Sequence, residues 1–348
     1  MNVEEHCTLD NRDKELLQHL QDAFPVAKSP WAEIGEKLGI TEEEVLSRSQ
    51  RLSSGGVIRK LRTILNGQKI QACSSTLMAM RVPAERMEDV VSIVNEYMSV
   101  THNYQREHDY NLWFTVTTCG SGGKDLRSTV EEIKERTGIP DSDVLDLPTT
   151  RVFKVDVRFK FTDFEDHGDS GGGGDIPKIE TERTKMNTDD DQDQDETDQA
   201  ILRAAQEGIP VVKEPFERIA KEAGISQDEV IARLKKLING SVIKRLGISI
   251  NQRKVGIVAN AVVAWKVPQE HVDSVGNMLA AYREITHCYE RVTMPGKWEH
   301  NLFTVIHGYT RESVEEIAER LSKVVGISDF LVLFSNEQFK RTSVMHPY

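Results

Sequence analysis

Two short strings in the sequence place histidine, tyrosine and arginine at alternate positions. They are His102-Asn103-Tyr104-Gln105-Arg106 and His287-Cys288-Tyr289-Glu290-Arg291. Histidine titrates near neutral pH and can serve as an acid, a base or a metal ligand. Arginine binds carboxylates through two parallel hydrogen bonds, and aromatic rings suit a flat apolar ligand. The strings therefore indicate a site that binds an anion and moves protons.

Further polar and aromatic residues follow each string. We take four histidines as candidate acids or bases: His102, His108, His287 and His307. The candidate substrate-binding residues are Tyr104, Arg106, Asn111, Trp113, Tyr289, Arg291, Trp298 and Asn301. Four residues join Arg106 to Asn111, whereas nine join Arg291 to Asn301. The longer loop could act as a lid, although drift in loop length explains it equally well.

A β-strand would bring the three residues of each string onto one face, because strand side chains alternate between faces. We expect a hairpin of strands 100–106 and 111–117. Its apolar stripe of Leu112, Phe114 and Val116 would contact helices, which leaves Asn111, Trp113 and Thr115 on the other face. Two such faces brought together would enclose a polar and aromatic cavity. The alternative is that this face only meets solvent or a partner sheet.

The elements around the hairpin alternate between strand and helix. Strand 75–82, helix 85–97, the hairpin, helix 125–137 and a strand from 144 onward give the order βαββαβ, which specifies a ferredoxin-like sandwich. Before it, a helix, the Gly39 turn and a second helix capped by Thr41 form a helix-turn-helix pattern. Residues 57–60 would begin a β wing. The predicted class is α+β, with a winged helix-turn-helix before each sandwich.

The whole pattern occurs twice at an offset of 185 residues. Pro25 to Pro30 matches Pro210 to Pro215, and Thr101-His102 matches Thr286-His287. We therefore predict a tandem duplication. The predicted domains are helix-turn-helix domains at 10–66 and 198–251, ferredoxin-like domains at 67–162 and 252–348, and a disordered acidic linker at 163–197. We expect the two halves to pair, within one chain or between chains.

The net charge of −12 comes mostly from the linker region, because residues 161–198 contain 14 acidic and 3 basic side chains. The remainder is near neutral, without the basic excess of a dedicated DNA-binding protein. No apolar run could span a membrane, and the polar N-terminus does not resemble a secretory signal. We expect a cytoplasmic protein. The four cysteines form no Cys-x-x-Cys pair, so we interpret them as buried or incidental thiols.

The layout resembles the Lrp/AsnC-like regulators, and specific strings resemble the siroheme decarboxylases. The string from His102 to Phe114 is similar to one siroheme decarboxylase subunit. The string from Thr286 to Arg291, with Trp298, Asn301 and Ile306-His307-Gly308, is similar to its partner subunit. The resemblance covers both halves and omits only the linker and the extreme termini. Where the family usually has tyrosine, this chain has His300.

The resemblance implies a reaction. Siroheme would lose the C12 and C18 acetate carboxyls to give 12,18-didecarboxysiroheme, for haem or haem d1 biosynthesis. No cofactor beyond the iron tetrapyrrole substrate, and no resident metal, is expected. The alternatives are a transcriptional regulator that senses a small molecule and a non-catalytic haem-binding protein. DNA binding is not expected, because the second helices begin with Glu42-Glu43-Glu44 and Gln227-Asp228-Glu229.

Overall fold

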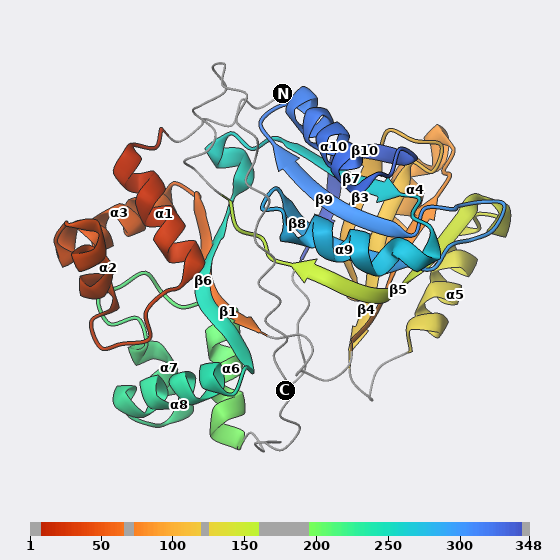
Figure 1. Cartoon of the computed structure of the whole chain (residues 1–348). Coiled ribbons are helices and arrows are strands. Elements are labelled where there is room, and N and C mark those ends of the chain that lie inside the picture. Colours follow the sequence, from red (N-terminus) through yellow and green to blue (C-terminus); the bar gives the residue numbers. More distant parts are fainter. Residues whose placement is uncertain (1–7, 66–72, 120–124, 160–194, 343–348) are drawn as a thin grey trace. The chain divides into compact units, whose positions relative to one another are not determined.

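The computed structural model describes residues 8–65, 73–119, 125–159 and 195–342, which divide into two compact units. One unit combines residues 1–70 with 158–256, and the other combines 71–157 with 257–347. Each unit therefore contains one segment from each half of the chain (Figure 1). The sequence suggested domains that follow one another along the chain, whereas the compact units join matching domains of the two halves.

The first unit contains the two helix-turn-helix segments. Their helices are α1 (Asn11–Asp22), α2 (Pro30–Leu38), α3 (Glu42–Ser54), α6 (Glu196–Glu207), α7 (Glu217–Ala223) and α8 (Gln227–Asn239). Gly39 ends α2 at φ 66°, a left-handed conformation that glycine adopts without a steric penalty. Thr41 then caps α3 by accepting a hydrogen bond from the amide of Glu44. The Glu44 carboxylate itself accepts a hydrogen bond from Arg48 of the same helix.

The predicted wing takes a different form. Strand β1 (Ile58–Leu65) pairs antiparallel with β6 (Ile243–Ile250), which is its counterpart in the other half. The strand after each helix-turn-helix thus finds its hydrogen-bonding partner in the opposite half and not in a local hairpin. The fold class is otherwise as predicted, and this two-stranded sheet joins the two helix-turn-helix segments.

The second unit contains two βαββαβ segments, as predicted. The first consists of β2 (Cys73–Met80), α4 (Met87–Glu96), β3 (Val100–Arg106), β4 (Leu112–Cys119), α5 (Leu126–Thr137) and β5 (Val144–Val155). The second consists of β7 (Ala259–Trp265), α9 (Val272–Ala281), β8 (Ile285–Arg291), β9 (Leu302–Gly308), α10 (Arg311–Val325) and β10 (Phe330–Arg341). Short 3-10 helices are η1 (Ala84–Arg86), η2 (Asp141–Asp143), η3 (Gln252–Val255) and η4 (Gln269–His271).

The two segments share one closed barrel with the strand order β10-β3-β4-β2-β5-β8-β9-β7. The last strand of each segment closes it. Residues 144–148 of β5 pair with β2, and residues 149–155 continue along β8 of the other half. In the same way, β10 pairs with β7 over 330–334 and with β3 over 335–341. The predicted pairing of the two sheets thus occurs within the chain, through main-chain hydrogen bonds.

Helices cover the outside of the barrel. Leu112, Phe114 and Val116 of β4 pack with Val90 of α4 and Ile133 of α5, as the sequence predicted. The second half has an equivalent cluster, which also receives Phe153 from β5 of the first half. A Cβ at Gly276 of α9 would lie 2.5 Å from the Phe153 ring. Glycine at this helix position therefore leaves space for an aromatic residue of the opposite half.

The sequence-based interpretation of the cysteines is wrong for two of the four residues. Cys73 and Cys119 are opposite each other at the ends of β2 and β4, and they form a disulfide. The pairing depends on strand register across 46 residues of sequence, which residue spacing does not reveal. Cys288 is a buried free thiol, as expected, and Cys7 is outside the described residues.

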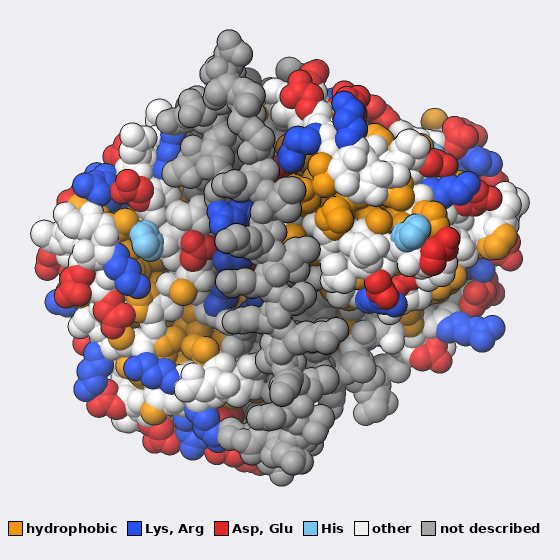
Figure 2. Space-filling view, viewed as in Figure 1, with side chains coloured by type: hydrophobic (Ala, Val, Ile, Leu, Met, Phe, Trp, Pro, Cys, Tyr) orange, Lys and Arg blue, Asp and Glu red, His pale blue; other side chains and the backbone are white. Residues whose placement is uncertain are grey.

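The predicted linker lies mostly outside the described residues, except that 195–197 form the cap and first residues of α6. Within the described part of the chain, no helix is both long and apolar enough to cross a membrane. Acidic and basic side chains are interspersed with hydrophobic and uncharged ones on the visible face of each unit, as Figure 2 shows.

Candidate functional site

The inner face of the barrel has an apolar region and a region rich in histidine. The apolar region draws on both halves and contains Ala79, Tyr110, Trp113, Leu145, Leu147, Ala264, Trp298, Phe303 and Leu333. The β3 residues His102, Tyr104 and Arg106 share this inner face, because their neighbour Asn103 turns outward and donates to Asn95 of α4. His102 and Arg106 are about 13 Å apart along the strand, so the two regions are distinct.

Three of the four candidate histidines lie in the same part of the barrel. His102 and His287 hold equivalent places, since the Nδ1 atom of each lies 3.0 Å from the hydroxyl of the preceding threonine, Thr101 or Thr286. His307 of β9 is close enough for the charge of His287 to lower its pKa, and the charge of His102 likewise lowers the pKa of His287. The three side chains therefore form one electrostatically coupled cluster.

Burial is the main cause of the lowered pKa values of these three histidines. It lowers the pKa of His102 and of His287 to about 4, and that of His307 to about 3, because desolvation disfavours the charged imidazolium. The charge of Arg341 lowers all three values further. The histidines are thus neutral at pH 7 in the absence of a ligand. In this state they can accept a proton, donate an N–H hydrogen bond or ligate a metal through nitrogen.

The two candidate tyrosines lie next to the histidines on the same strands. The ring centres of His102 and Tyr104 are 6.3 Å apart, and those of His287 and Tyr289 are 5.9 Å apart. Burial raises the pKa of Tyr289 to about 12, which keeps its hydroxyl protonated. Each pair presents one imidazole and one phenol to the inside of the barrel, which suits a ligand that is both flat and polar.

The candidate arginines were expected to bind substrate, but both donate hydrogen bonds to oxygens of the protein itself. The Nη1 atom of Arg106 donates to the carbonyl oxygen of Leu333 at 2.7 Å and to the Ser335 hydroxyl at 3.0 Å. Arg291 makes the equivalent pair of hydrogen bonds with Leu147 and Thr149. Both arginines are almost fully buried, and burial lowers their pKa to about 10. Each arginine therefore ties its own half to the last strand of the other half.

The two candidate asparagines also have matching contacts. The side-chain amide of Asn111 donates to the carbonyl oxygen of Val82 and accepts from its amide N–H, at 2.9 Å in each case. Asn301 makes the same two hydrogen bonds with Val267. Both side chains are thus engaged with the backbone next to their hairpins. Their place in the structure favours a role in holding the loops that enter β4 and β9.

The remaining candidates, His108, Trp113 and Trp298, gather in the apolar region. The ring centre of Trp298 is 5.4 Å from that of Trp113 and 5.6 Å from that of His108. The longer loop of the second half therefore places its tryptophan against the first half. The ring centre of His300 is 5.3 Å from that of Trp298. His108 and His300 thus form a second, separate pair of histidines.

Sequence reasoning missed three residues on the histidine side of the barrel. Arg341 lies opposite His102 in the register of β10 and β3. Val152 and Val155 lie opposite Tyr289 and His287, and their side chains are 49% and 50% exposed. Exposed valines on the inner wall show that this side of the barrel is open to solvent. The signal was absent from the sequence, because these residues reach the site only through pairing between the two halves.

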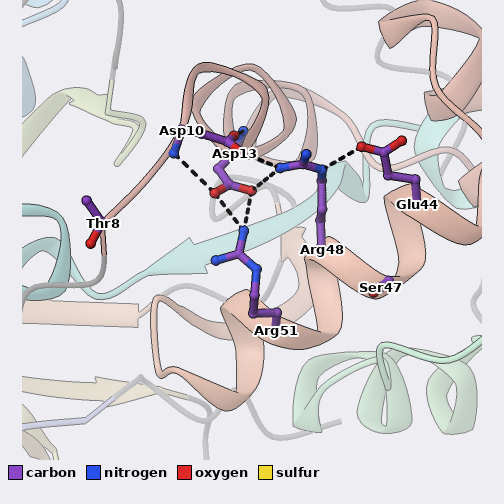
Figure 3. A pocket seen from close by; sticks show the side chains of 7 residues that line it. All are labelled: Thr8, Asp10, Asp13, Glu44, Ser47, Arg48 and Arg51. Carbon is purple, nitrogen blue, oxygen red and sulfur yellow. Dashed lines mark hydrogen bonds and ion pairs between the residues drawn. The ribbon is translucent and has the colours of Figure 1, made fainter.

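A pocket of about 460 Å³ lies elsewhere, in the helix-turn-helix unit (Figure 3). It is lined by Thr8, Asp10, Asp13, Glu44, Ser47, Arg48 and Arg51. Arg48 and Arg51 both donate to Asp13 there. Arg233 and Asp198 repeat the central ion pair in the other half. Because these charges satisfy one another, we interpret this network as the link between the first and third helices and assign the functional site to the barrel.

The described residues contain no group of three or more histidine, cysteine or acidic side chains that could hold a metal ion. The clustered histidines are spread over different strands of the barrel wall. They are consequently placed to contact different parts of one ligand.

Comparison with known proteins also separates the helix-turn-helix segments from the barrel segments in each half of the chain. The family described as AsnC-like ligand binding domain matches residues 72–154 and 254–340. The family described as siroheme decarboxylase NirDL-like HTH domain matches residues 13–59 and 198–243. Each family therefore matches once in each half, and the first corresponds to most of the barrel.

Similar proteins include both fused and divided forms. The siroheme decarboxylase NirDL subunit of Paracoccus denitrificans is 32% identical over 316 residues, 90% of each chain. The siroheme decarboxylase beta subunit of Methanosarcina barkeri is 46% identical over 150 residues, which are 43% of this chain and 98% of that subunit. The crystal structure of the siroheme decarboxylase NirDL with an iron-uroporphyrin III analogue aligns with a TM-score of 0.66 and 26% identity, covering 97% of this chain and 94% of that one.

Proposed function

Because the chain belongs to the siroheme decarboxylase family, whose members are decarboxylating enzymes, we propose that it converts siroheme to 12,18-didecarboxysiroheme. The acetate carboxyls at C12 and C18 leave as carbon dioxide. The observation that supports this most strongly is the cluster of His102, His287 and His307 inside the barrel. A related family member binds an iron-uroporphyrin analogue, and such a macrocycle matches the flat, polar and aromatic surroundings of these histidines.

The chemistry requires one proton for each carboxyl group lost. The bond between the acetate methylene carbon and the carboxylate carbon breaks, and the carboxylate leaves as carbon dioxide. The electron pair stays on the methylene carbon, where the adjoining pyrrole can delocalise it, and a proton converts that carbon to a methyl group. The step is redox neutral. The protein must therefore orient the acetate, exclude water from it and deliver a proton.

The histidine cluster supplies groups for these tasks. An imidazole that hydrogen-bonds a carboxylate becomes easier to protonate, because the anion offsets the desolvation that lowers its pKa. His102 and His287 occupy equivalent positions and are the proposed proton donors, with His307 next to His287. Tyr104 and Tyr289 flank the macrocycle. The product then enters haem or haem d1 biosynthesis, and no other cofactor takes part.

The direct test is anaerobic incubation of the full chain with siroheme, followed by mass analysis of the extracted tetrapyrrole. The expected product is lighter than siroheme by two units of carbon dioxide. A His102→Ala, His287→Ala double variant should release carbon dioxide about 10²–10⁴-fold more slowly while it still binds siroheme. His271→Asn changes an exposed histidine of the same unit and is the matched control. Recovery of intact siroheme from a stable complex would identify a tetrapyrrole-binding protein without this activity.

A further inference from the structure

Arg341 at the end of β10 is the charged residue common to the three clustered histidines. It lies opposite His102 in the antiparallel register, so the two side chains share the inner face of the barrel. Its charge acts on His287 and His307 as well. The main chain continues this pairing, because the amide of Thr342 donates to the carbonyl oxygen of Thr101 at 2.7 Å. The guanidinium is thus held near both halves of the site.

No carboxylate partner for Arg341 is present among the residues that the structure describes. Two other arginines of this unit have carboxylate partners: Arg311 pairs with Glu107 and Arg320 with Glu284. Arg341 is only half-exposed, so solvent screens its charge incompletely. A half-buried guanidinium without a counter-charge, beside three neutral imidazoles that can donate hydrogen bonds, favours the binding of an anion.

The equivalent place in the other half has no such charge. Val155 of β5 lies opposite His287, as Arg341 lies opposite His102. A second difference is at β4 and β9, where Thr117 pairs with Ser75 and His307 pairs with the matching Asn260. The barrel is therefore symmetric in its backbone but not in its charge. One wall carries Arg341, and the opposite wall carries exposed valines, with the opposite charges of Lys154 and Asp156 next to Val155 acting on His287.

We propose that Arg341 binds a carboxylate of the tetrapyrrole and thereby fixes the orientation of the macrocycle in the barrel. This inference rests on the proposed function. Siroheme has carboxylates around its whole edge, so a barrel with two equal walls could hold it in more than one orientation. Because Arg341 stands on one wall and Val155 takes its place on the other, a single orientation is favoured. One of the two reactive acetates then reacts first in every turnover, and one partly decarboxylated isomer forms.

Binding measurements test the contact without depending on turnover. The probes are iron uroporphyrin III, which has four acetates and four propionates, and iron coproporphyrin III, in which methyl groups replace the acetates. We expect Arg341→Gln to weaken binding of iron uroporphyrin III by about 10–100-fold, as for a lost charge-assisted hydrogen bond. Arg341→Lys should recover part of the loss, because lysine keeps the charge but not the planar fork. Arg320→Gln, at an exposed ion pair outside the barrel, is the control.

The two probes identify the type of carboxylate. If only iron uroporphyrin III binds more weakly to Arg341→Gln, the partner is an acetate; if both probes do so, it is a propionate. Unchanged binding of both probes would overturn the contact.

Mass and chromatographic analysis of the partly decarboxylated product tests the orientation. We expect one isomer from the native protein and two isomers from Arg341→Gln. The same single isomer from both proteins would overturn the proposed orientation. A native protein that releases no carbon dioxide from siroheme refutes the proposed function whatever the probes show.

Discussion

Arg291 donates a hydrogen bond of 3.1 Å from Nη1 to the carbonyl oxygen of Leu147, and this bond joins the two halves of the barrel. Arg106 of the first half donates the matching bond, of 2.7 Å, to the carbonyl oxygen of Leu333 in the second half. Both bonds lie where the last strand of one half turns from its own sheet to the other. The arginines thus stabilise the crossing points on which barrel closure depends.

We therefore predict that Arg106→Lys lowers the free energy of unfolding by about 1–3 kcal/mol. The ammonium stays buried but cannot serve both acceptors of the guanidinium in the same geometry, so a buried carbonyl loses its partner. Urea denaturation measures the change, and Arg320→Lys on the outer surface should shift it by less than about 0.5 kcal/mol. An unchanged unfolding midpoint with lost turnover would return Arg106 to the substrate-binding role expected from the sequence.

The sequence was sufficient to predict the elements and the repeat, because both depend on local patterns. The alternation in β4 placed Leu112 against the helices and Trp113 inside, and the structure agrees. The offset of 185 residues predicted the duplication, and in the structure His102 and His287 make matching contacts with the threonine that precedes each of them. The duplicated fold therefore followed from periodicity and the repeat, and the family followed from the resemblance of the motif strings.

Pairing between the halves could not be predicted in the same way. Arg341 reaches His102, and Val155 reaches His287, only because each last strand crosses to the other half. Nothing local to residues 341 or 155 specifies that register. The same reason explains why the pairing of β1 with β6 was not foreseen. The Cys73–Cys119 disulfide was missed because it depends on the register of β2 and β4 within one half. Motif strings likewise grouped His108 with His102, although the strand places them in different parts of the barrel.

The half-buried histidines of the cluster predict a loss of stability as the pH falls below neutrality. Folding lowers the pKa of His102 and His287 from 6.5 to about 4, and that of His307 to about 3. Between pH 6.5 and 4 the unfolded chain binds protons that the folded barrel does not. The free energy of unfolding therefore decreases as the pH is lowered through this range. The slope is at most about 1.4 kcal/mol per pH unit for each histidine.

Thermal or urea unfolding between pH 7 and pH 5 measures this slope before most carboxylates titrate. His307→Gln should make it shallower, because one of the three groups no longer titrates. His271→Gln, at an exposed position, should leave it as in the native protein. Equal slopes in the native protein and His307→Gln would mean that His307 is hydrated when folded.

The Cys73–Cys119 disulfide predicts an effect of reduction on the barrel. It closes a loop of 46 residues, and the entropy that such a bond removes from the unfolded chain corresponds to about 4 kcal/mol. We expect the Cys73→Ser, Cys119→Ser variant to unfold with a free energy about 2–4 kcal/mol lower. Reduced native protein should behave like the variant. Identical unfolding of the oxidised protein and the variant would contradict a stabilising bond.

The helix-turn-helix unit is predicted not to bind specific DNA. The first turn of α3 contains Glu42, Glu43 and Glu44, which would repel phosphates. Arg48 and Arg51 of the same helix are engaged by Asp13, which is buried. A gel-shift assay with genomic fragments at low salt should give no specific complex. A sequence-specific complex of nanomolar affinity would instead support the regulator alternative.

The last prediction concerns protons that accompany the substrate. Without a ligand, the histidine cluster is neutral at pH 7, because its pKa values are about 3 to 4. Carboxylates placed beside the imidazoles favour the charged form and raise those values. Binding of a polycarboxylated tetrapyrrole should therefore draw protons from solution and become tighter as the pH falls from 7 towards 6. Calorimetry of iron uroporphyrin III binding in two buffers with different ionisation enthalpies measures the uptake.

Variants locate the groups that take up these protons. A His102→Asn, His287→Asn, His307→Asn variant should bind with little net proton uptake, whereas His271→Asn should keep the native value. The proton needed for each new methyl group would then already be on the cluster when the carboxylate leaves. If the native protein binds the probe without proton uptake, the histidines stay neutral in the complex, and the methyl proton must come from another donor.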